Sequence, residues 1–173
     1  MDLERLRSRI RCVPDFPKPG IIFRDITPLL ADAEALDSAS ERMAGPFLDA
    51  GIDLVLGIES RGFIFAPLVA RRLHAGFVPV RKLGRLPAEV LRETYALEYG
   101  VDSLEMHADA VGRGHRVVIV DDVMATGGTA EATCRLAERA GADVMGLSFL
   151  IELTSLGGRT RLAERKLHSV IQY

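Results

Sequence analysis

The sequence predicts an α/β fold in which a mostly parallel central sheet is flanked by helices on both faces. Short apolar runs at 52–58, 76–80, 117–120 and 144–151 are typical of strands that are buried on both faces. Helical patterns lie between them, most clearly at 63–75 and 128–140. Strands that alternate with helices in this way form parallel sheets, because each crossover helix returns the chain to the same edge of the sheet.

The size and charge of the chain exclude several classes of protein. It has 173 residues, which is enough for one domain, and its net charge is −2 with a pI near 6.1. That charge weighs against a nucleic-acid-binding protein. No apolar run approaches the ~20 residues that span a bilayer, and the N-terminus lacks the apolar region of a secretory signal. We therefore expect a cytoplasmic protein with one domain, 1–173, and neither a membrane nor a nucleic-acid partner.

Outside the strand and helix pattern, three segments carry local predictions. Residues 2–13 place apolar side chains at helical spacing and predict a helix. Three prolines and a glycine between positions 14 and 20 then end this helix and force an irregular, extended stretch. Residues 34–50 predict a second helix. Residues 88–99 predict an amphipathic helix with a charged, solvated face. The two cysteines and four histidines have no metal-binding spacing, so no metal site made of protein ligands is expected.

Two adjacent carboxylates, Asp121 and Asp122, stand at the end of the 117–120 strand. In open α/β sheets, ligands bind at the carboxyl ends of the strands. Neighbouring acids repel each other unless a cation neutralises them or hydroxyl groups donate hydrogen bonds to them. The pair therefore predicts a site for ribose hydroxyls or a divalent cation.

The next residues, 126–129, read Thr-Gly-Gly-Thr and open the following helix. Glycines let backbone N–H groups approach an anion closely, and the helix N-terminus is the positive end of its dipole. Acids and a Thr-Gly turn are each typical of ordinary loop and capping chemistry when they occur alone. Together, behind one apolar strand, they predict a ligand with vicinal hydroxyls and a phosphate, which describes a ribose 5-phosphate. The sequence lacks the Walker A lysine and the G-x-G-x-x-G of dinucleotide folds.

Residues 117–129 resemble the phosphoribosyl pyrophosphate signature of the type I phosphoribosyltransferase family. Further segments extend the resemblance, in order, over essentially the whole chain: Asp15-Phe16-Pro17, Phe23-Arg24-Asp25-Ile26, Glu59-Ser60-Arg61-Gly62-Phe63, Arg81-Lys82, Leu97-Glu98-Tyr99-Gly100 and Glu152-Leu153-Thr154. Within the family, Phe-Arg-Asp-Ile and Leu-Glu-Tyr-Gly point to members that use adenine. The resemblance implies transfer of a phosphoribosyl group from phosphoribosyl pyrophosphate to adenine, as in purine salvage, with Mg²⁺ bound mainly through phosphoribosyl pyrophosphate.

The resemblance also implies an architecture for the site. It predicts a homodimer, a base-binding hood at 1–33 and a flap at 81–100 that closes over the active site. The flap conflicts with the amphipathic helix predicted from the pattern of 88–99, and the resemblance is the better guide. A cis peptide bond is expected between Glu59 and Ser60.

The resemblance assigns four residues to catalysis. Glu98 would transfer a proton near the purine, and Arg61 would stabilise the departing pyrophosphate. Asp121 and Asp122 would hold the ribose hydroxyls. The remaining residues are implied in substrate binding. Ala125, Thr126, Gly127, Gly128 and Thr129 would bind the 5′-phosphate, and Phe23, Arg24 and Leu153 would contact the base. Glu59, Ser60, Arg81, Lys82 and Arg85 would contact the pyrophosphate, with Arg81 coming from its own or a neighbouring subunit, and Tyr99 would act from the flap.

Alternatives remain open from the residues alone. Arg61 also fits a surface salt bridge, and Phe23 and Leu153 fit core packing equally well. The base could be hypoxanthine, guanine or xanthine, because the phosphoribosyl half of the site would be the same. A regulator that only senses phosphoribosyl pyrophosphate is the rival from another class. It would be expected to carry a nucleic-acid-binding element, and none is visible in the sequence.

Overall fold

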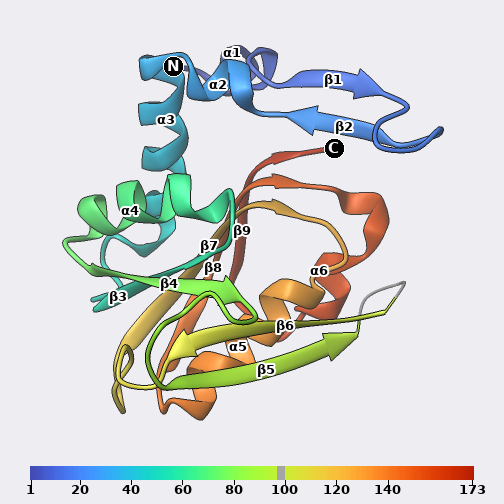
Figure 1. Ribbon diagram of the computed structural model, residues 1–173. Coiled ribbons are helices and arrows are strands. Elements are labelled where there is room, and N and C mark those ends of the chain that lie inside the picture. Colours follow the sequence, from blue (N-terminus) through green and yellow to red (C-terminus); the bar gives the residue numbers. More distant parts are fainter. Residues whose placement is uncertain (97–99) are drawn as a thin grey trace. The chain divides into compact units, whose positions relative to one another are not determined.

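The computed structural model describes residues 1–96 and 100–173, and these form two compact units, 1–42 and 43–173 (Figure 1). The N-terminal unit contains the whole of the predicted hood segment, 1–33, and continues to residue 42. No helix among the described residues has both the length and the apolar character needed to cross a membrane.

The N-terminal unit is built around a two-stranded antiparallel sheet. Its elements are α1 (Leu3–Ser8), β1 (Arg11–Pro14), β2 (Ile22–Asp25), α2 (Thr27–Leu30) and most of α3 (Ala33–Ala44). The predicted helix over 2–13 is therefore wrong in its second half. Proline cannot continue a helix, and residues 11–14 instead pair with 22–25. The helix predicted over 34–50 ends at Ala44, where Gly45 and Pro46 tighten the chain into a 3₁₀ turn.

A seven-stranded sheet forms the second unit, in the order β5-β6-β4-β3-β7-β8-β9. The five strands from β4 to β9 run parallel, and β5 and β6 are antiparallel to their neighbours. Its elements are η1 (Gly45–Phe47), β3 (Leu54–Ile58), α4 (Gly62–Leu73), β4 (Gly76–Lys82), β5 (Val90–Ala96), β6 (Val101–His107), β7 (Arg116–Met124), α5 (Gly128–Arg139), β8 (Asp143–Glu152), η2 (Thr154–Leu156), α6 (Gly158–Arg161) and β9 (Leu167–Gln172).

Two crossover helices cover opposite faces of this sheet. The first, α4, connects β3 to β4, and the second, α5, connects β7 to β8 (Figure 1). Because β4 and β8 lie on opposite sides of the β3–β7 pair, and such crossovers are right-handed in about 98% of cases, the helices lie on opposite faces. The predicted fold class, a mostly parallel sheet flanked by helices, is confirmed.

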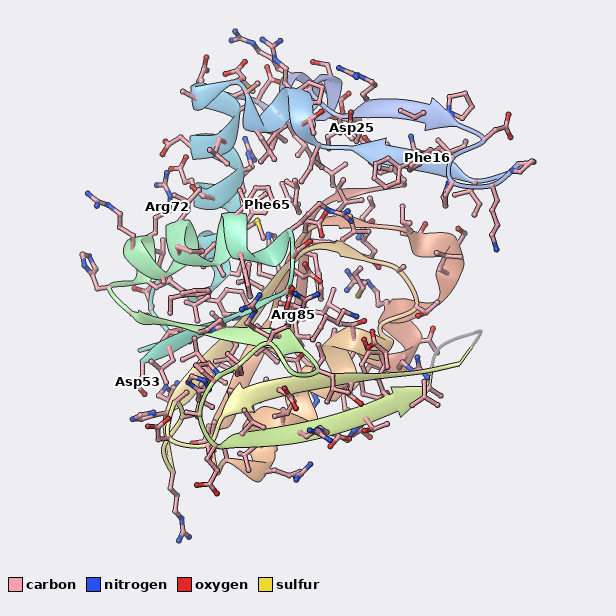
Figure 2. The ribbon with its side chains drawn as sticks, in the orientation of Figure 1. Phe16, Asp25, Asp53, Phe65, Arg72 and Arg85 are labelled. Carbon is pink, nitrogen blue, oxygen red and sulfur yellow. The ribbon has the colours of Figure 1, made fainter. Side chains whose placement is uncertain are left out.

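Strand β7, the middle one of the five parallel strands, is deeply buried. Val117, Val118, Ile119 and Val120 are all fully inaccessible. Each such side chain contributes about 1.5–3 kcal/mol relative to an exposed position, so this strand is a rigid base for the residues that follow it. At the opposite end of the sheet, the Asp53 carboxylate (labelled in Figure 2) accepts a hydrogen bond from Arg116 N–H, which fixes where β7 begins.

The amphipathic helix predicted over 88–99 is wrong. Residues 90–96 form β5, which pairs with β6 along its whole length, from Val90 opposite His107 to Ala96 opposite Val101. Side chains of β5 alternate between faces, with Glu93 and Tyr95 turned inward and Thr94 exposed. Val90, Thr94 and Tyr95 favour strands, but the local sequence is compatible with either a helix or a strand. Pairing with β6 selects the strand.

Candidate active site

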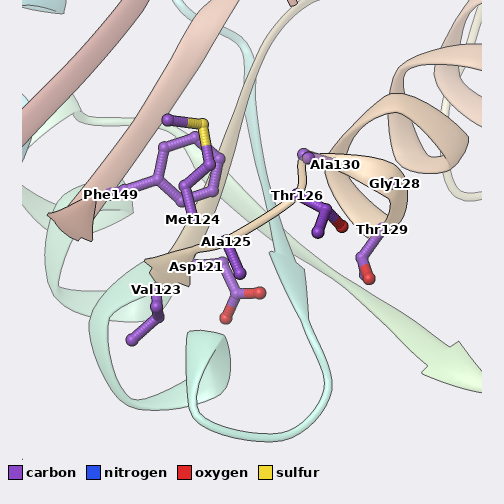
Figure 3. Close-up of a pocket in the computed structure, with 10 residues that line it drawn as sticks. Asp121, Val123, Met124, Ala125, Thr126, Gly128, Thr129, Ala130 and Phe149 are labelled. Atoms are coloured by element: carbon purple, nitrogen blue, oxygen red, sulfur yellow. The ribbon is translucent and has the colours of Figure 1, made fainter. Parts of the chain in front are cut away.

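One pocket lies at the C-terminal end of β7, where the chain turns into α5 (Figure 3). It is lined by Asp121, by residues 123–130 and by Phe149 of β8. Gly127 has a φ of +80°, a left-handed conformation that favours glycine and turns the chain into the helix. The first N–H groups of a helix have no partner within it and lie at its positive end. All five residues predicted to hold a phosphate, 125–129, line this pocket.

A second pocket adjoins the first, because Asp121, Val123 and Thr129 line both. Its other walls come from the loop between β3 and α4, from the end of β4 and from the second acid of β7. These lining residues are Glu59, Ser60, Arg61, Lys82 and Asp122. The structure thus brings together the carboxylates, one arginine and one lysine that sequence reasoning placed in a single site.

The two acids lie in different surroundings. Asp122 is buried, and its carboxylate forms an ion pair with the half-exposed guanidinium of Arg61. Asp121 accepts a hydrogen bond from Asp122 N–H at 2.8 Å. Burial, and next the negative charge of Asp122, raise the pKa of Asp121 well above its usual value, and the charge of Arg61 opposes this only in part. A cation or a hydroxyl donor at this point would relieve the repulsion.

Arg61 reaches the acids because α4 begins unusually close to β7. A Cβ atom on Gly62 would lie 2.9 Å from Val120 O and 3.0 Å from Asp121 Oδ1. Only glycine allows this approach without displacing the strand. The peptide bond between Glu59 and Ser60, at the start of the same loop, is cis, as the resemblance predicted.

The Glu59 carboxylate organises the cationic side of the second pocket. It accepts hydrogen bonds from Lys82 N–H at 3.0 Å and from Arg81 Nε at 3.2 Å. Burial raises the pKa of Glu59, but these donors outweigh it, and the pKa ends below its usual value. Arg81 also donates to Arg85 O at 3.1 Å, and Arg85 is exposed on the segment that follows β4 (Figure 2). Arg81 and Arg85 therefore flank the pocket without lining it.

Leu153 lies at the end of β8, next to the first pocket. Its N–H donates to Met124 O at 2.9 Å, and its side chain is half-buried. Phe23 and Arg24 belong to the N-terminal unit, on β2. Phe23 contacts Phe16 edge to face at 5.3 Å (Phe16 is labelled in Figure 2), and Arg24 Nη1 donates to Cys12 Sγ at 2.6 Å.

Glu98 and Tyr99, predicted for proton transfer and for the flap, lie outside the described residues. Several neighbours of the site were assigned no role from the sequence. On the β5–β6 hairpin, Tyr95 contacts Thr129 and Asp102 forms an ion pair with Lys82, and Gly158 packs against the 125–127 loop. The alternation of side chains along a strand would have predicted that Tyr95 points inward, but this segment was interpreted as a helix.

Among residues 1–96 and 100–173, no three His, Cys, Asp or Glu side chains come together as a metal site. The oxygen atoms of Asp121 and Asp122 are nevertheless the ligand type that Mg²⁺ prefers. Two carboxylates at one pocket can therefore face a magnesium ion that is held mainly by a phosphorylated ligand.

Comparison with known proteins agrees with a site for a phosphorylated ligand. Residues 30–171 match the phosphoribosyl transferase domain. The chain is 58% identical to the adenine phosphoribosyltransferase of Solibacter usitatus over 97% of each chain. The adenine phosphoribosyltransferase of Rhodothermus marinus has a similar crystal structure, with a TM-score of 0.94 and 58% identity over 99% of this chain and 98% of that one. The enzyme of Saccharomyces cerevisiae, crystallised with adenine and an imino-altritol bisphosphate, is 37% identical over 97% of each chain, with a TM-score of 0.92.

Proposed function

This chain belongs to the phosphoribosyl transferase domain family, and we propose that it is an adenine phosphoribosyltransferase. It transfers the 5-phosphoribosyl group of phosphoribosyl pyrophosphate to adenine and yields AMP and pyrophosphate, the reaction of adenine salvage. The observation that carries this function is the pair of adjoining pockets at the end of β7. An anion cradle lies on one side of two carboxylates, and a guanidinium and an ammonium group lie on the other.

The cradle at 125–129 binds the 5′-phosphate and leaves the ribose beside Asp121 and Asp122. Both carboxylates accept hydrogen bonds from the ribose hydroxyls, and their charge stabilises the oxocarbenium character that C1′ gains as its bond to pyrophosphate breaks. Phosphate binding far from C1′ is used here for orientation, because it fixes the sugar relative to both departing and attacking groups.

The leaving pyrophosphate faces the second pocket. Arg61 and Lys82 lie where negative charge develops, and Arg81 and Arg85 add positive charge beside them. Bound with the substrate, Mg²⁺ supplies Lewis-acid stabilisation of the same charge. Arg61 is held by Asp122, so the residue that orients the ribose also orients the arginine.

Leu153 contacts adenine in this proposal, and the family resemblance assigns Phe23 and the backbone at Arg24 to the same base. The yeast relative whose crystal structure contains adenine supports the choice of base. Glu98 accepts or donates the purine proton from the flap.

We expect the enzyme to act as a cytoplasmic homodimer. The second unit exposes apolar side chains on α4, β4 and the segment after it, at Ile64, Phe77 and Leu83, which a second copy would cover.

The function is tested by pyrophosphate release with phosphoribosyl pyrophosphate and Mg²⁺, with adenine, hypoxanthine, guanine and xanthine assayed in parallel. Turnover with adenine alone is the expected result. Turnover with another base would contradict the base site at 23–24 and 153 and leave the phosphoribosyl site standing. Binding of phosphoribosyl pyrophosphate without turnover of any base would indicate a sensor.

A further inference from the structure

One tyrosine hydroxyl connects the β5–β6 hairpin to the first pocket, which is lined by Asp121, residues 123–130 and Phe149 and is called the phosphate pocket below. Tyr95 is 5% exposed, and its hydroxyl oxygen lies 3.2 Å from Asp102 Oδ2 and 3.2 Å from Thr129 Oγ1. Asp102 faces Tyr95 across the hairpin, and its Oδ2 also forms an ion pair with Lys82 Nζ. Groups from four elements therefore meet here, and two of them, Lys82 and Thr129, line the proposed substrate pockets.

Counting protons shows that these bonds compete. A tyrosine hydroxyl has one proton, and an ionised carboxylate can only accept. Burial raises the pKa of Asp102, but hydrogen bonds and the charge of Lys82 bring it below its usual value, so the carboxylate is ionised at neutral pH. When Tyr95 donates to Asp102, its contact with Thr129 is made by the threonine proton. Thr129 then faces the phosphate pocket with lone pairs only, which is the wrong polarity for an anion.

We propose that Tyr95 is a positioning residue that sets the direction of the Thr129 hydroxyl. When the 5′-phosphate enters, the Tyr95 proton turns from Asp102 to Thr129 Oγ1, and the Thr129 proton turns to a phosphate oxygen. Both are rotations of an O–H bond, and no proton changes its owner. Asp102 keeps Lys82 and the Ser103 N–H, which donates to it at 2.8 Å. The inference rests on the proposed function only in that the pocket binds a ribose 5-phosphate group.

This arrangement also links ligand binding to the end of β5. Tyr95 is on the strand that leads to Glu98, three residues further along the chain. A phosphate that recruits the Thr129 proton also strengthens the bond between Thr129 and Tyr95, because each hydroxyl in the chain polarises the next. Occupation of the phosphate pocket should thereby stabilise the end of β5.

The test measures binding of ribose 5-phosphate by calorimetry to the full-length protein. Tyr95→Phe keeps the buried ring and removes only the hydroxyl, so we expect affinity to fall roughly three- to tenfold, the value of one hydrogen bond. Thr94→Val is the matched control. Thr94 lies on the next rung of the same hairpin, and its hydroxyl bonds Ser103 at 2.9 Å on the exposed face. This variant should bind within twofold of the wild type, and an equal loss in both variants would overturn the proposal.

A double-mutant cycle separates positioning from a general structural effect. Thr129→Val should weaken binding by itself, and adding Tyr95→Phe to it should change affinity little further, because the tyrosine acts through the threonine. Thr129→Ser, which retains the hydroxyl, should restore both the affinity and its sensitivity to Tyr95→Phe. Independent, multiplicative losses at the two positions would contradict the proposal.

Kinetics provide a readout that distinguishes this inference from the proposed function. Tyr95→Phe should raise KM for phosphoribosyl pyrophosphate by a similar factor and leave KM for adenine unchanged. If the wild type bound ribose 5-phosphate but did not turn over adenine, the proposed function would fail while the calorimetry still tested the tyrosine. If the wild type turned over adenine and Tyr95→Phe changed neither constant, only the positioning role would fail.

Discussion

Asp121 is held next to a second carboxylate in surroundings that favour its neutral form. Burial is the larger cause of its raised pKa, and the charge of Asp122 is the next. An acid whose pKa is raised in the folded protein contributes stability that is complete below its unfolded pKa and is lost as pH rises through the folded value. As pH rises above the unfolded pKa, holding this acid buried beside Asp122 therefore costs the folded protein stability, as is common for functional sites.

Replacing this acid by an amide should stabilise the free protein. Asp121→Asn keeps an oxygen to accept from Asp122 N–H and removes the repulsion, so its Tm should exceed that of the wild type at pH 8. The difference should shrink as pH falls, because the wild-type carboxyl then binds a proton. Scanning calorimetry from pH 8 to pH 5 checks this, with the exposed Asp109→Asn as the control that should follow the wild type. A difference that stays constant over the range would show that charge is not its cause.

At the scale of elements, the proposed phosphate-binding loop, 125–129, depends on its contact with α6. A Cβ atom on Gly158, at the start of α6, would contact Ala125 O and lie 3.2 Å from Gly127 N. An ion pair holds α6 in this position, because Arg159 donates to the buried Glu152 carboxylate through Nε at 2.9 Å and through Nη2 at 2.6 Å. Glu152 also accepts from Gln172 of β9 at 3.1 Å. The C-terminal part of the chain thus packs against the 125–127 loop and supports it.

A single methyl group should disturb this support. Gly158→Ala forces the loop backbone to shift, so we expect KM for phosphoribosyl pyrophosphate to rise and stability to fall by about 1–3 kcal/mol, as overpacking usually costs. Gly45→Ala is the control, because nothing lies within 4 Å of that Cβ position and its φ is not positive. Urea denaturation and initial rates measure both effects. Unchanged kinetics in Gly158→Ala would mean that the loop adapts without losing its shape.

The sequence predicted those elements whose pattern allows one interpretation. The apolar run at 117–120 and the Thr-Gly-Gly-Thr turn correctly predicted β7, the turn at Gly127 and the start of α5, because an apolar run and a glycine turn are visible in the local sequence. Strand β5 was mistaken for a helix, since Leu91, Glu93 and Tyr95 reveal their common face only once β6 is known to pair with them. Contacts such as Tyr95 with Thr129, or Gly158 with Ala125, join distant segments and leave no local signal.

At the scale of the whole molecule, the negative charge of phosphoribosyl pyrophosphate makes its binding affinity depend on Mg²⁺. The protein has a net charge of −2, and its proposed site places two carboxylates beside a polyanionic substrate. Mg²⁺ that arrives with the pyrophosphate would offset this repulsion, whereas the proposed 5′-phosphate site at 125–129 consists of backbone and hydroxyl groups that need no cation. The two ends of phosphoribosyl pyrophosphate should therefore differ in their dependence on the metal.

Thermal shifts of the unmodified protein can measure that difference. At a ligand concentration of about 100 Kd, binding adds about 2.7 kcal/mol to stability, which for a chain of this length raises Tm by roughly 5–10 °C. We expect a shift of this size with phosphoribosyl pyrophosphate and Mg²⁺, and most of it should disappear when EDTA removes the metal. The shift produced by ribose 5-phosphate should survive EDTA, and Mg²⁺ alone should leave Tm unchanged. A rise in Tm with Mg²⁺ alone would instead assign the ion to Asp121 and Asp122 in the free protein, and equal losses for both ligands would mean that the phosphate cradle itself needs the cation.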